Sequence, residues 1–219
     1  MSESTIKVVG TGSIHVVPDV TRLEVRANRV FKTYSEAYAC ASENSTWMVK
    51  ILEYNHQPGK LAKTIRLEIE DNMVNEYDED GDYIGKVPDG YRLTQEIKID
   101  LAIDNVLVNK IVRGAGKFIQ GAQIKIGYTV KDPRPSQLKM LERAVHDAHE
   151  KAAIMAGACG RELGEVKFID YGYSHVTVYS QAREIHDNAE ASASTVSSLD
   201  ITPDDLVVSD NVNVVWWLK

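Results

Sequence analysis

Apolar and polar residues alternate along several stretches of this chain, as they do in strands that bury one face and expose the other. The clearest stretch runs from Arg92 to Ile103, and a second runs from Thr64 to Glu70. Because each leaves one face polar, antiparallel pairing is favoured, and we expect these two strands to form a hairpin. Further strands are predicted at residues 6–9, 13–17, 21–28, 124–130, 164–173 and 206–218.

Three other stretches have the spacing of helices. Thr33 and Glu36 have the spacing of a capping box, which predicts the start of a long helix that ends before Pro58. A shorter helix is predicted at residues 106–118. The long helix is expected to bury a stripe made of Tyr34, Tyr38, Ala41, Met48 and Leu52.

A second long helix is predicted to begin at Asp132, with Pro133 in its first turn, and to end at Gly160. Its apolar residues recur at spacings of four and three, which predicts a narrow face that packs closely on a sheet or on another helix. The predicted stripe is Leu141, Val145, Ala148, Ala152, Met155 and Cys159.

These elements predict an α+β fold of antiparallel or mixed sheets with two long helices and one short helix. We expect a single domain over residues 1–219, with two closely packed lobes at about 1–89 and 90–219. Residues 176–205 are rich in Ser, Ala and Glu, and they exceed the usual length of a loop. We interpret them as a flexible segment or as an arm that orders against another subunit.

Composition excludes several classes of protein. The 219 residues are 43% hydrophobic and 26% charged, which is typical of a globular protein. A net charge of −7 disfavours binding to nucleic acid or anionic lipid, and no apolar run is long enough to span a membrane. Because the N-terminus lacks the pattern of a signal peptide, we expect a cytoplasmic protein, or a periplasmic one if an export signal was removed. Cys40 and Cys159 are interpreted as buried free thiols.

Taken in order, several motifs resemble those of the SIMPL domain family, which includes YggE-like and periplasmic immunogenic protein-like members. The matching segments are Val8–Ser13, Val17–Asp19, Gly90–Tyr91, Leu141–Ala148 with Lys151–Ala152, Gly160, Leu163–Gly164 and Val212–Val215. The resemblance covers nearly the whole chain and implies an α+β fold without established catalytic residues. It also implies a bacterial protein that forms homo-oligomers and is linked to tolerance of oxidative stress.

Two glycine or aspartate motifs look like binding loops but lack essential parts. Gly10 and Gly12 follow a strand, yet a dinucleotide loop needs a third glycine and a helix at that point, so we interpret this segment as a β-turn. Asp78, Asp80 and Asp82 alternate as in a calcium loop. Because the glycine is misplaced and no helix precedes the segment, a solvated hairpin turn is the better interpretation.

The candidates for metal ligands are His146, His149, Glu142 and Glu150, which lie within a few turns of one helix. They lie off the predicted apolar stripe, which favours a polar surface over a metal site. No recognisable nucleophile motif is present, and we predict no catalytic residues and no cofactor.

Three functional hypotheses follow. The first is a non-enzymatic, self-associating protein with a stress-related or envelope-related binding role. The second is a metal-binding protein or metal-dependent enzyme that uses the helix histidines. The third is a small-molecule binding module whose pocket is lined by Trp216, Trp217 and Tyr91.

Overall fold

The computed structural model of the protein describes residues 4–172, 183–185 and 203–219, the middle segment by its backbone alone. The chain forms two compact units, each with one sheet, and the predicted α+β class is confirmed. Most of residues 176–205 lie outside the described residues, apart from a three-residue strand and residues 203–205.

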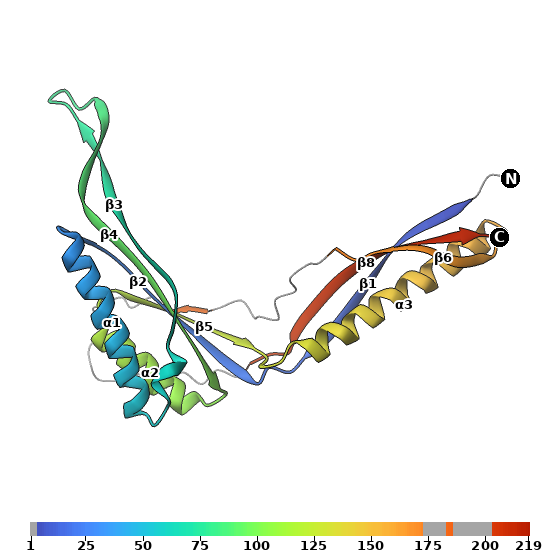
Figure 1. The fold of residues 1–219 in the computed structure, drawn as a ribbon, viewed down its shortest axis with the longest axis horizontal. Coiled ribbons are helices and arrows are strands. Elements are labelled where there is room, and N and C mark those ends of the chain that lie inside the picture. The colour runs from blue at the N-terminus through green and yellow to red at the C-terminus, as the bar shows by residue number, and fades with distance from the viewer. Residues whose placement is uncertain (1–3, 173–182, 186–202) are drawn as a thin grey trace. The chain divides into compact units, whose positions relative to one another are not determined.

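The first unit contains a three-stranded antiparallel sheet in the order β1-β8-β6, with helix α3 against one face (Figure 1). Its core lies between the helix and the two longer strands, where Val8, Val212 and Trp216 pack on Ala148. The elements of this unit are β1 (Thr5–Val16), α3 (Arg134–Ala158), β6 (Leu163–Asp170) and β8 (Leu206–Leu218).

The second unit contains a five-stranded sheet in the order β3-β4-β2-β5-β7. Helices α1 and α2 pack on the same face, because alternate residues of β2 and β4 form one core with both helices. The elements are β2 (Val20–Phe31), α1 (Tyr34–Tyr54), the 3-10 helix η1 (Gly59–Leu61), β3 (Lys63–Tyr77), β4 (Tyr83–Ala102), α2 (Asn105–Phe118), β5 (Ala122–Thr129) and β7 (Arg183–Ile185). The lobe boundary expected near Asp89 falls inside β4.

Helix α1 begins as its sequence predicts and is fixed to the sheet by a buried polar network. The side chain of Thr33 accepts a hydrogen bond from the Glu36 N–H, and the Glu36 carboxylate accepts one from the Thr33 N–H. Inside the unit, the Gln95 amide of β4 donates to the Ala41 carbonyl at 3.0 Å and accepts from Asn44 at 3.0 Å. Because an unpaired buried amide is costly, this network fixes the position of α1 along β4.

The buried stripe predicted for α1 is only partly correct. Ala41, Met48 and Leu52 are buried, but Tyr34 and Tyr38 are exposed. Ala37 takes the predicted place of the tyrosines in the core, where it packs on Leu93.

The turn predicted at Gly10–Gly12 is wrong, because β1 continues through both glycines and pairs with β8 without interruption. Both glycines face α3. A Cβ atom at Gly10 would collide with the carbonyl oxygen of Ala144, and one at Gly12 would collide with that of Met140. The glycines are therefore explained by the contact of the helix backbone with the strand backbone.

The stripe predicted for α3 is only partly correct, because Ala148 and Ala152 are buried but Leu141 and Val145 are only half-buried. The buried residues recur strictly every four positions, and Met155 and Cys159 are exposed. A row at this spacing runs obliquely around a helix and can follow the twist of the strands beneath it. The row is Met140, Ala144, Ala148, Ala152 and Ala156.

We predict that Gly12→Ala destabilises the first unit, because the new methyl group must displace the backbone of α3. The expected loss in the free energy of unfolding is about 3 kcal/mol, near the upper end for an overpacked core. Urea titration followed by tryptophan fluorescence measures this loss.

Gly157→Ala is the matched control, since Gly157 lies on the same helix and an added Cβ meets nothing within 4 Å. Helix propensity alone predicts that this control is neutral or stabilising by up to about 1 kcal/mol. Equal losses in the two variants would contradict the close-packing explanation.

Candidate functional site

The candidate metal ligands all lie on α3, but the structure separates them. His146 Nδ1 lies 3.5 Å from Glu150 Oε1 on the exposed side of the helix. His149 instead packs edge-on against the Trp216 ring, with centroids 6.3 Å apart. Glu142 is exposed. Among the residues that the structure describes, no three His, Cys, Asp or Glu side chains converge on a point that could hold a metal.

The segment of alternating aspartates is the hairpin turn that joins β3 to β4, as predicted. Asp78 Oδ1 accepts hydrogen bonds from the N–H groups of Asp80 and Asp82 at 3.0 and 2.8 Å. Gly81 has a φ of 86°, which glycine adopts without strain. The Asp78 carboxylate is therefore part of the turn itself.

Two of the aromatic residues proposed to line a pocket lie on opposite faces of one sheet. Trp216 is buried against α3, while Trp217 faces the other side of the sheet with Lys167 Nζ 3.9 Å from its ring centroid. Tyr91 belongs to the second unit, where its ring packs edge-on against Tyr34.

Neither cysteine is fully buried. Cys159 is exposed at the end of α3, and Cys40 is partly buried within α1. The prediction of buried thiols is therefore wrong for Cys159.

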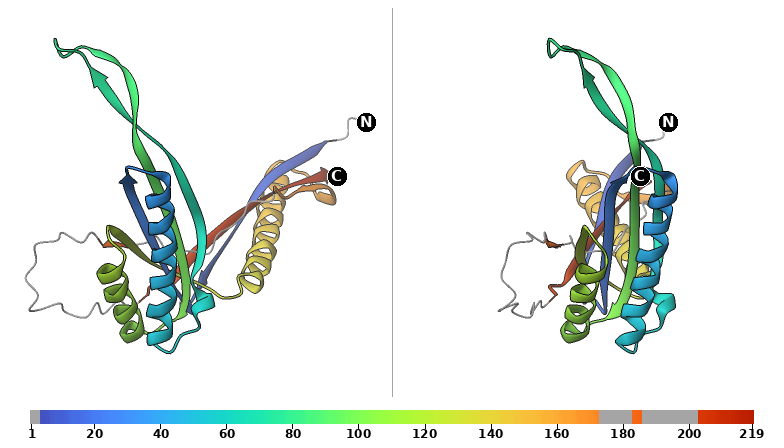
Figure 2. Two further views of the ribbon diagram at one scale, coloured as in Figure 1. Left: turned by 60° about the vertical axis from the view of Figure 1, so that its left-hand side comes forward. Right: turned by 90° about the vertical axis from the view of Figure 1, so that its left-hand side faces the viewer.

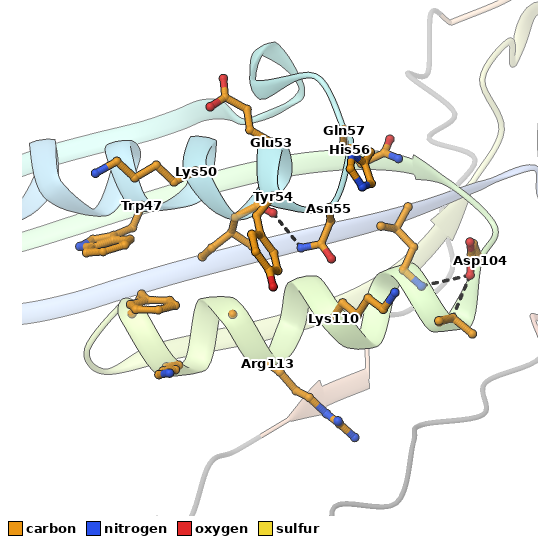
Figure 3. A pocket seen from close by; sticks show the side chains of 16 residues that line it. Trp47, Lys50, Glu53, Tyr54, Asn55, His56, Gln57, Asp104, Lys110 and Arg113 are labelled. Atoms are coloured by element: carbon orange, nitrogen blue, oxygen red, sulfur yellow. Dashed lines mark hydrogen bonds between the residues drawn. The ribbon is translucent and has the colours of Figure 1, made fainter.

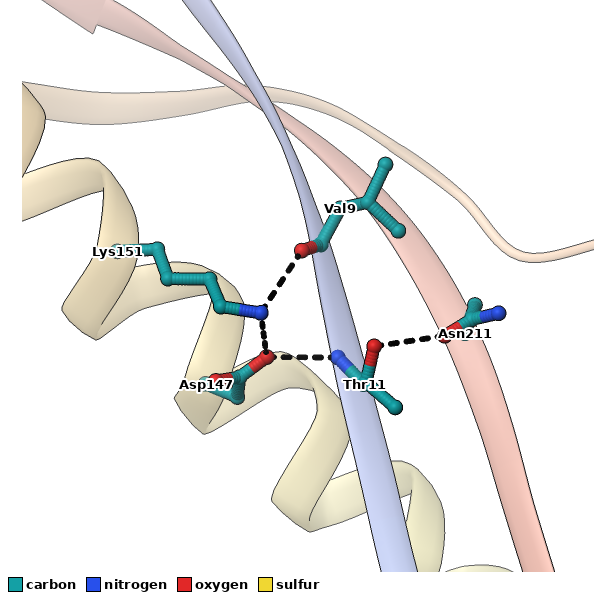
Figure 4. A network of polar contacts seen from close by, with 5 residues as sticks. All are labelled: Val9, Thr11, Asp147, Lys151 and Asn211. Atoms are coloured by element: carbon teal, nitrogen blue, oxygen red, sulfur yellow. Dashed lines mark hydrogen bonds and ion pairs between the residues drawn. The ribbon is translucent and has the colours of Figure 1, made fainter.

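Sequence reasoning missed a set of polar contacts between α3 and the outer edge of β1. Thr11 N–H donates to Asp147 Oδ2 at 2.7 Å, and Lys151 Nζ donates to the same oxygen at 2.6 Å (Figure 4). Lys151 also reaches the Val9 carbonyl at 3.5 Å, and Arg143 donates to the Ser13 carbonyl at 2.7 Å. These helix side chains occupy backbone groups that an edge strand would otherwise offer to another strand.

The spacing of those three side chains is the signal that could have revealed them. Arg143, Asp147 and Lys151 are four residues apart, so they lie on one line along the helix. On a strand, alternate residues direct their backbone groups to the same edge, and Val9, Thr11 and Ser13 are such a set.

The outer edge of β3 differs from that of β1. The pairing of β2 with β4 ends at Phe31 and Tyr91, whereas β3 and β4 remain paired as far as Tyr77 and Tyr83. We call residues 71–77 and 83–90 the ribbon, because they form a two-stranded extension that projects beyond the start of α1 (Figures 1 and 2). The ribbon exposes Met73, Val74, Tyr77, Tyr83 and Ile84.

A groove lies between α1 and α2 on the outer side of the second unit, with a volume of about 1310 Å³ (Figure 3). The rings of Trp47 and Phe118 stack across it with centroids 4.5 Å apart. Its walls also carry Tyr54, Lys50 and Lys110. A smaller pocket lies beside this one, around Trp47 and Cys40.

Comparison with known proteins assigns the chain to a family. The model of the SIMPL family, described as "Protein of unknown function (DUF541)", matches residues 6–216. The chain belongs to the SIMPL family. It is 26% identical over 212 residues to the "Uncharacterized protein YggE" of Escherichia coli strain K12, a match that covers 96% of this chain and 81% of that protein.

The proteins of the same description from Escherichia coli O157:H7 and Shigella flexneri match this SIMPL chain with the same identity and coverage. The family resemblance inferred from the sequence motifs is thus confirmed. In the described part of this SIMPL protein, no helix is both long enough and apolar enough to cross a membrane.

Asp147 provides a test of the contacts that cover the β1 edge. Hydrogen bonds from Lys151 and then from the Thr11 N–H hold the pKa of its carboxyl below the ordinary value of 3.8. Because the pKa is lowered in the folded state, the ionised carboxylate stabilises the fold above pH 3.8. That contribution is lost as the pH falls through the folded-state pKa.

We predict that Asp147→Asn lowers the free energy of unfolding at pH 7 by about 0.5 kcal/mol, a value for ion pairs exposed to solvent. The difference from the wild type should narrow as the pH falls from 3.8 through the lowered folded-state pKa, because the wild-type carboxyl becomes protonated over that range. Urea titrations of both proteins between pH 7 and pH 2 measure this difference in the free energy of unfolding. Glu142→Gln, an exposed position on the same helix, should change little at any pH, and a gap for Asp147→Asn that persists unchanged to pH 2 would refute the assignment.

Proposed function

We propose that this SIMPL protein is a non-enzymatic module that assembles with copies of itself through the ribbon. The observation that carries the proposal is a paired but uncovered extension of β3 and β4, with apolar side chains exposed along it. A two-stranded ribbon alone is marginally stable in water, and clustered exposed apolar side chains are typical of protein interfaces.

The distribution of charge along β3 supports contact with a second copy through residues 71–77, the part of the strand that belongs to the ribbon. The proximal half of β3 exposes Arg66, Glu68 and Glu70 and contains a bulge, which are features that discourage strand pairing. Beyond the second bulge, at Asp71 and Met73, apolar residues predominate on the exposed ribbon. Charged residues are therefore denser before the ribbon than on it, although Ile65 and Leu67 are exposed in the proximal half too.

The base of the ribbon adds aromatic surface. Tyr34 and Tyr38 are more than half exposed on the first turns of α1, and Tyr34 packs against Tyr91 of β4. Tyrosine is enriched at interfaces because it offers a large apolar ring with a polar end. A second copy that contacts the ribbon could also bury these rings.

The edge of β3 also lacks the cover that β1 has. In the described part of the chain, no side chain from another element donates to or accepts from its outer backbone groups, in contrast to Arg143, Asp147 and Lys151 on β1. A free edge can be covered by a strand from a second copy. The stress-related or envelope-related role stays a prediction, supported by the family resemblance.

We predict that the wild-type protein at high micromolar concentration has the mass of two or more copies of the 24.4 kDa chain. Met73→Glu combined with Ile84→Glu should shift it to 24.4 kDa, because two charges would have to be buried in the contact. Light scattering coupled to size-exclusion chromatography measures both masses.

Lys86→Glu is the matched control, since it changes the charge of the same ribbon without removing an apolar side chain. It should retain most of the assembly. A wild-type protein that stays at 24.4 kDa, or a double variant with an unchanged assembly, would overturn the proposal.

A further inference from the structure

The groove between α1 and α2 is built by two antiparallel helices in close contact. Trp47 meets Phe118 at one end, and Ile51 packs on Gly114 in the middle, so the two helices run in opposite directions. Gly114 permits the approach, because an added Cβ would lie 2.9 Å from Ile51 Cγ2. The close contact forms the floor of the groove, and the longer side chains on either side form its walls.

Apolar surface in the groove is open to solvent. Tyr54 is 85% exposed and Val106 is 65% exposed, and they come from opposite walls. Figure 3 shows the Tyr54 ring extending from α1 toward α2. Such residues add nothing to the core of the unit, so their apolar surface is available to a ligand.

The charge of the groove is opposite to that of the whole chain. Lys50, Lys110 and Lys117 line it, although the protein has a net charge of −7. Within the described residues, none of the three lies in an ion pair; Lys50 and Lys117 instead lie over the rings of Trp47 and Phe118 at 4.9 and 5.1 Å.

The lining of the groove contains two acidic residues against four lysines and arginines. Both hydrogen bonds of Asp104 go to the N–H groups of Val106 and Leu107, where it caps α2. Glu53 is the other acidic residue in the lining. The groove therefore has an excess of positive charge beside its apolar floor.

The dimensions of the groove favour a helix over a metabolite. Its volume of about 1310 Å³ is above the usual range for small-molecule pockets, which reaches about 1,000 Å³. The lining of α2 from Val106 to Phe118 spans about 18 Å, or three turns of a partner helix. Lys110 and Lys117 are two turns apart, so they do not converge on one phosphate.

We infer that the groove binds an acidic amphipathic helix of a partner protein. The apolar face of that helix would cover Tyr54 and Val106, and its carboxylates would lie one to two turns apart beside Lys50, Lys110 and Lys117. Recognition of this kind combines apolar anchors at helical spacing with charges at the rim of the groove.

The test uses two fluorescein-labelled synthetic helices of 18 residues that share one leucine face, one with glutamates and the other with lysines at the flanking positions. Fluorescence anisotropy with the wild-type protein should show binding of the glutamate peptide at least about tenfold tighter than of the lysine peptide. Binding of the glutamate peptide should also change the fluorescence of Trp47 and weaken with added salt.

The decisive variant carries Lys50→Glu, Lys110→Glu and Lys117→Glu, and it should reverse the preference so that the lysine peptide binds more tightly. The matched control carries Lys60→Glu, Lys86→Glu and Lys139→Glu, which change the net charge equally outside the groove. Far-UV circular dichroism checks that both fold. The control should keep the wild-type preference.

Three results would overturn the inference: no binding of either peptide, equal binding of both, or a preference that the groove variant leaves unchanged. Displacement of the glutamate peptide by ATP or inorganic phosphate at low concentration would assign the groove to small anions and would also overturn it. Repeating the titration with Met73→Glu and Ile84→Glu separates this result from the proposed self-assembly, because the ribbon does not line the groove.

Discussion

The contact between the backbones of α3 and β1 is the constraint on which the first unit depends. Gly10 and Gly12 remove every side-chain atom from the strand where the carbonyl groups of Ala144 and Met140 approach it. Alanines every four residues on the helix complete the contact and leave little apolar bulk. Such an interface gains stability from close packing more than from the size of its side chains, so it tolerates added volume poorly.

This close approach also explains how the helix covers the edge of the sheet. Because α3 lies so near to β1, the short side chain of Asp147 reaches the Thr11 N–H, and Lys151 reaches the Val9 carbonyl. A helix held farther away by larger residues could not make both contacts. The glycines of β1 bring α3 close, and the polar side chains of α3 then cover the exposed edge of the strand.

The second unit leaves its corresponding edge open. In the ribbon, β3 pairs only with β4. Among the described residues, no helix side chain bonds to the outer edge of β3 there. Since this one chain covers the edge of β1 closely, exposure of an apolar ribbon on the other sheet is informative. The contrast supports an interface there, because a surface with no partner would favour aggregation.

The sequence predicted the helices and strands well, because their signals are local. Capping at Thr33 and alternation from Arg92 depend on neighbouring residues, and both appear in the structure as expected. The role of Gly10 could not be found in this way, since a glycine in a turn and a glycine beneath a helix look alike in one sequence. The buried face of α3 was only partly predicted, because its small alanines are a weaker hydrophobic signal than Leu141 or Met155.

The surfaces proposed as sites could not be predicted from the sequence, for a similar reason. Lys50 and Lys110 lie on different helices and share one groove only because Gly114 lets those helices approach. Periodicity along a helix also cannot tell an exposed apolar side chain such as Tyr54 from one that completes a core.

Several polar side chains of kinds that enzymes use are engaged in holding the fold. Asp78 closes a hairpin, Asp104 caps a helix and Gln95 completes a buried network. Arg22 and Asp100 form two hydrogen bonds across neighbouring strands, at 2.7 and 2.9 Å. Lys50, Lys110 and Lys117 lie in no ion pair among the described residues and line an exposed groove. The exposed groove and its lysines support the proposal that this SIMPL protein recognises another chain.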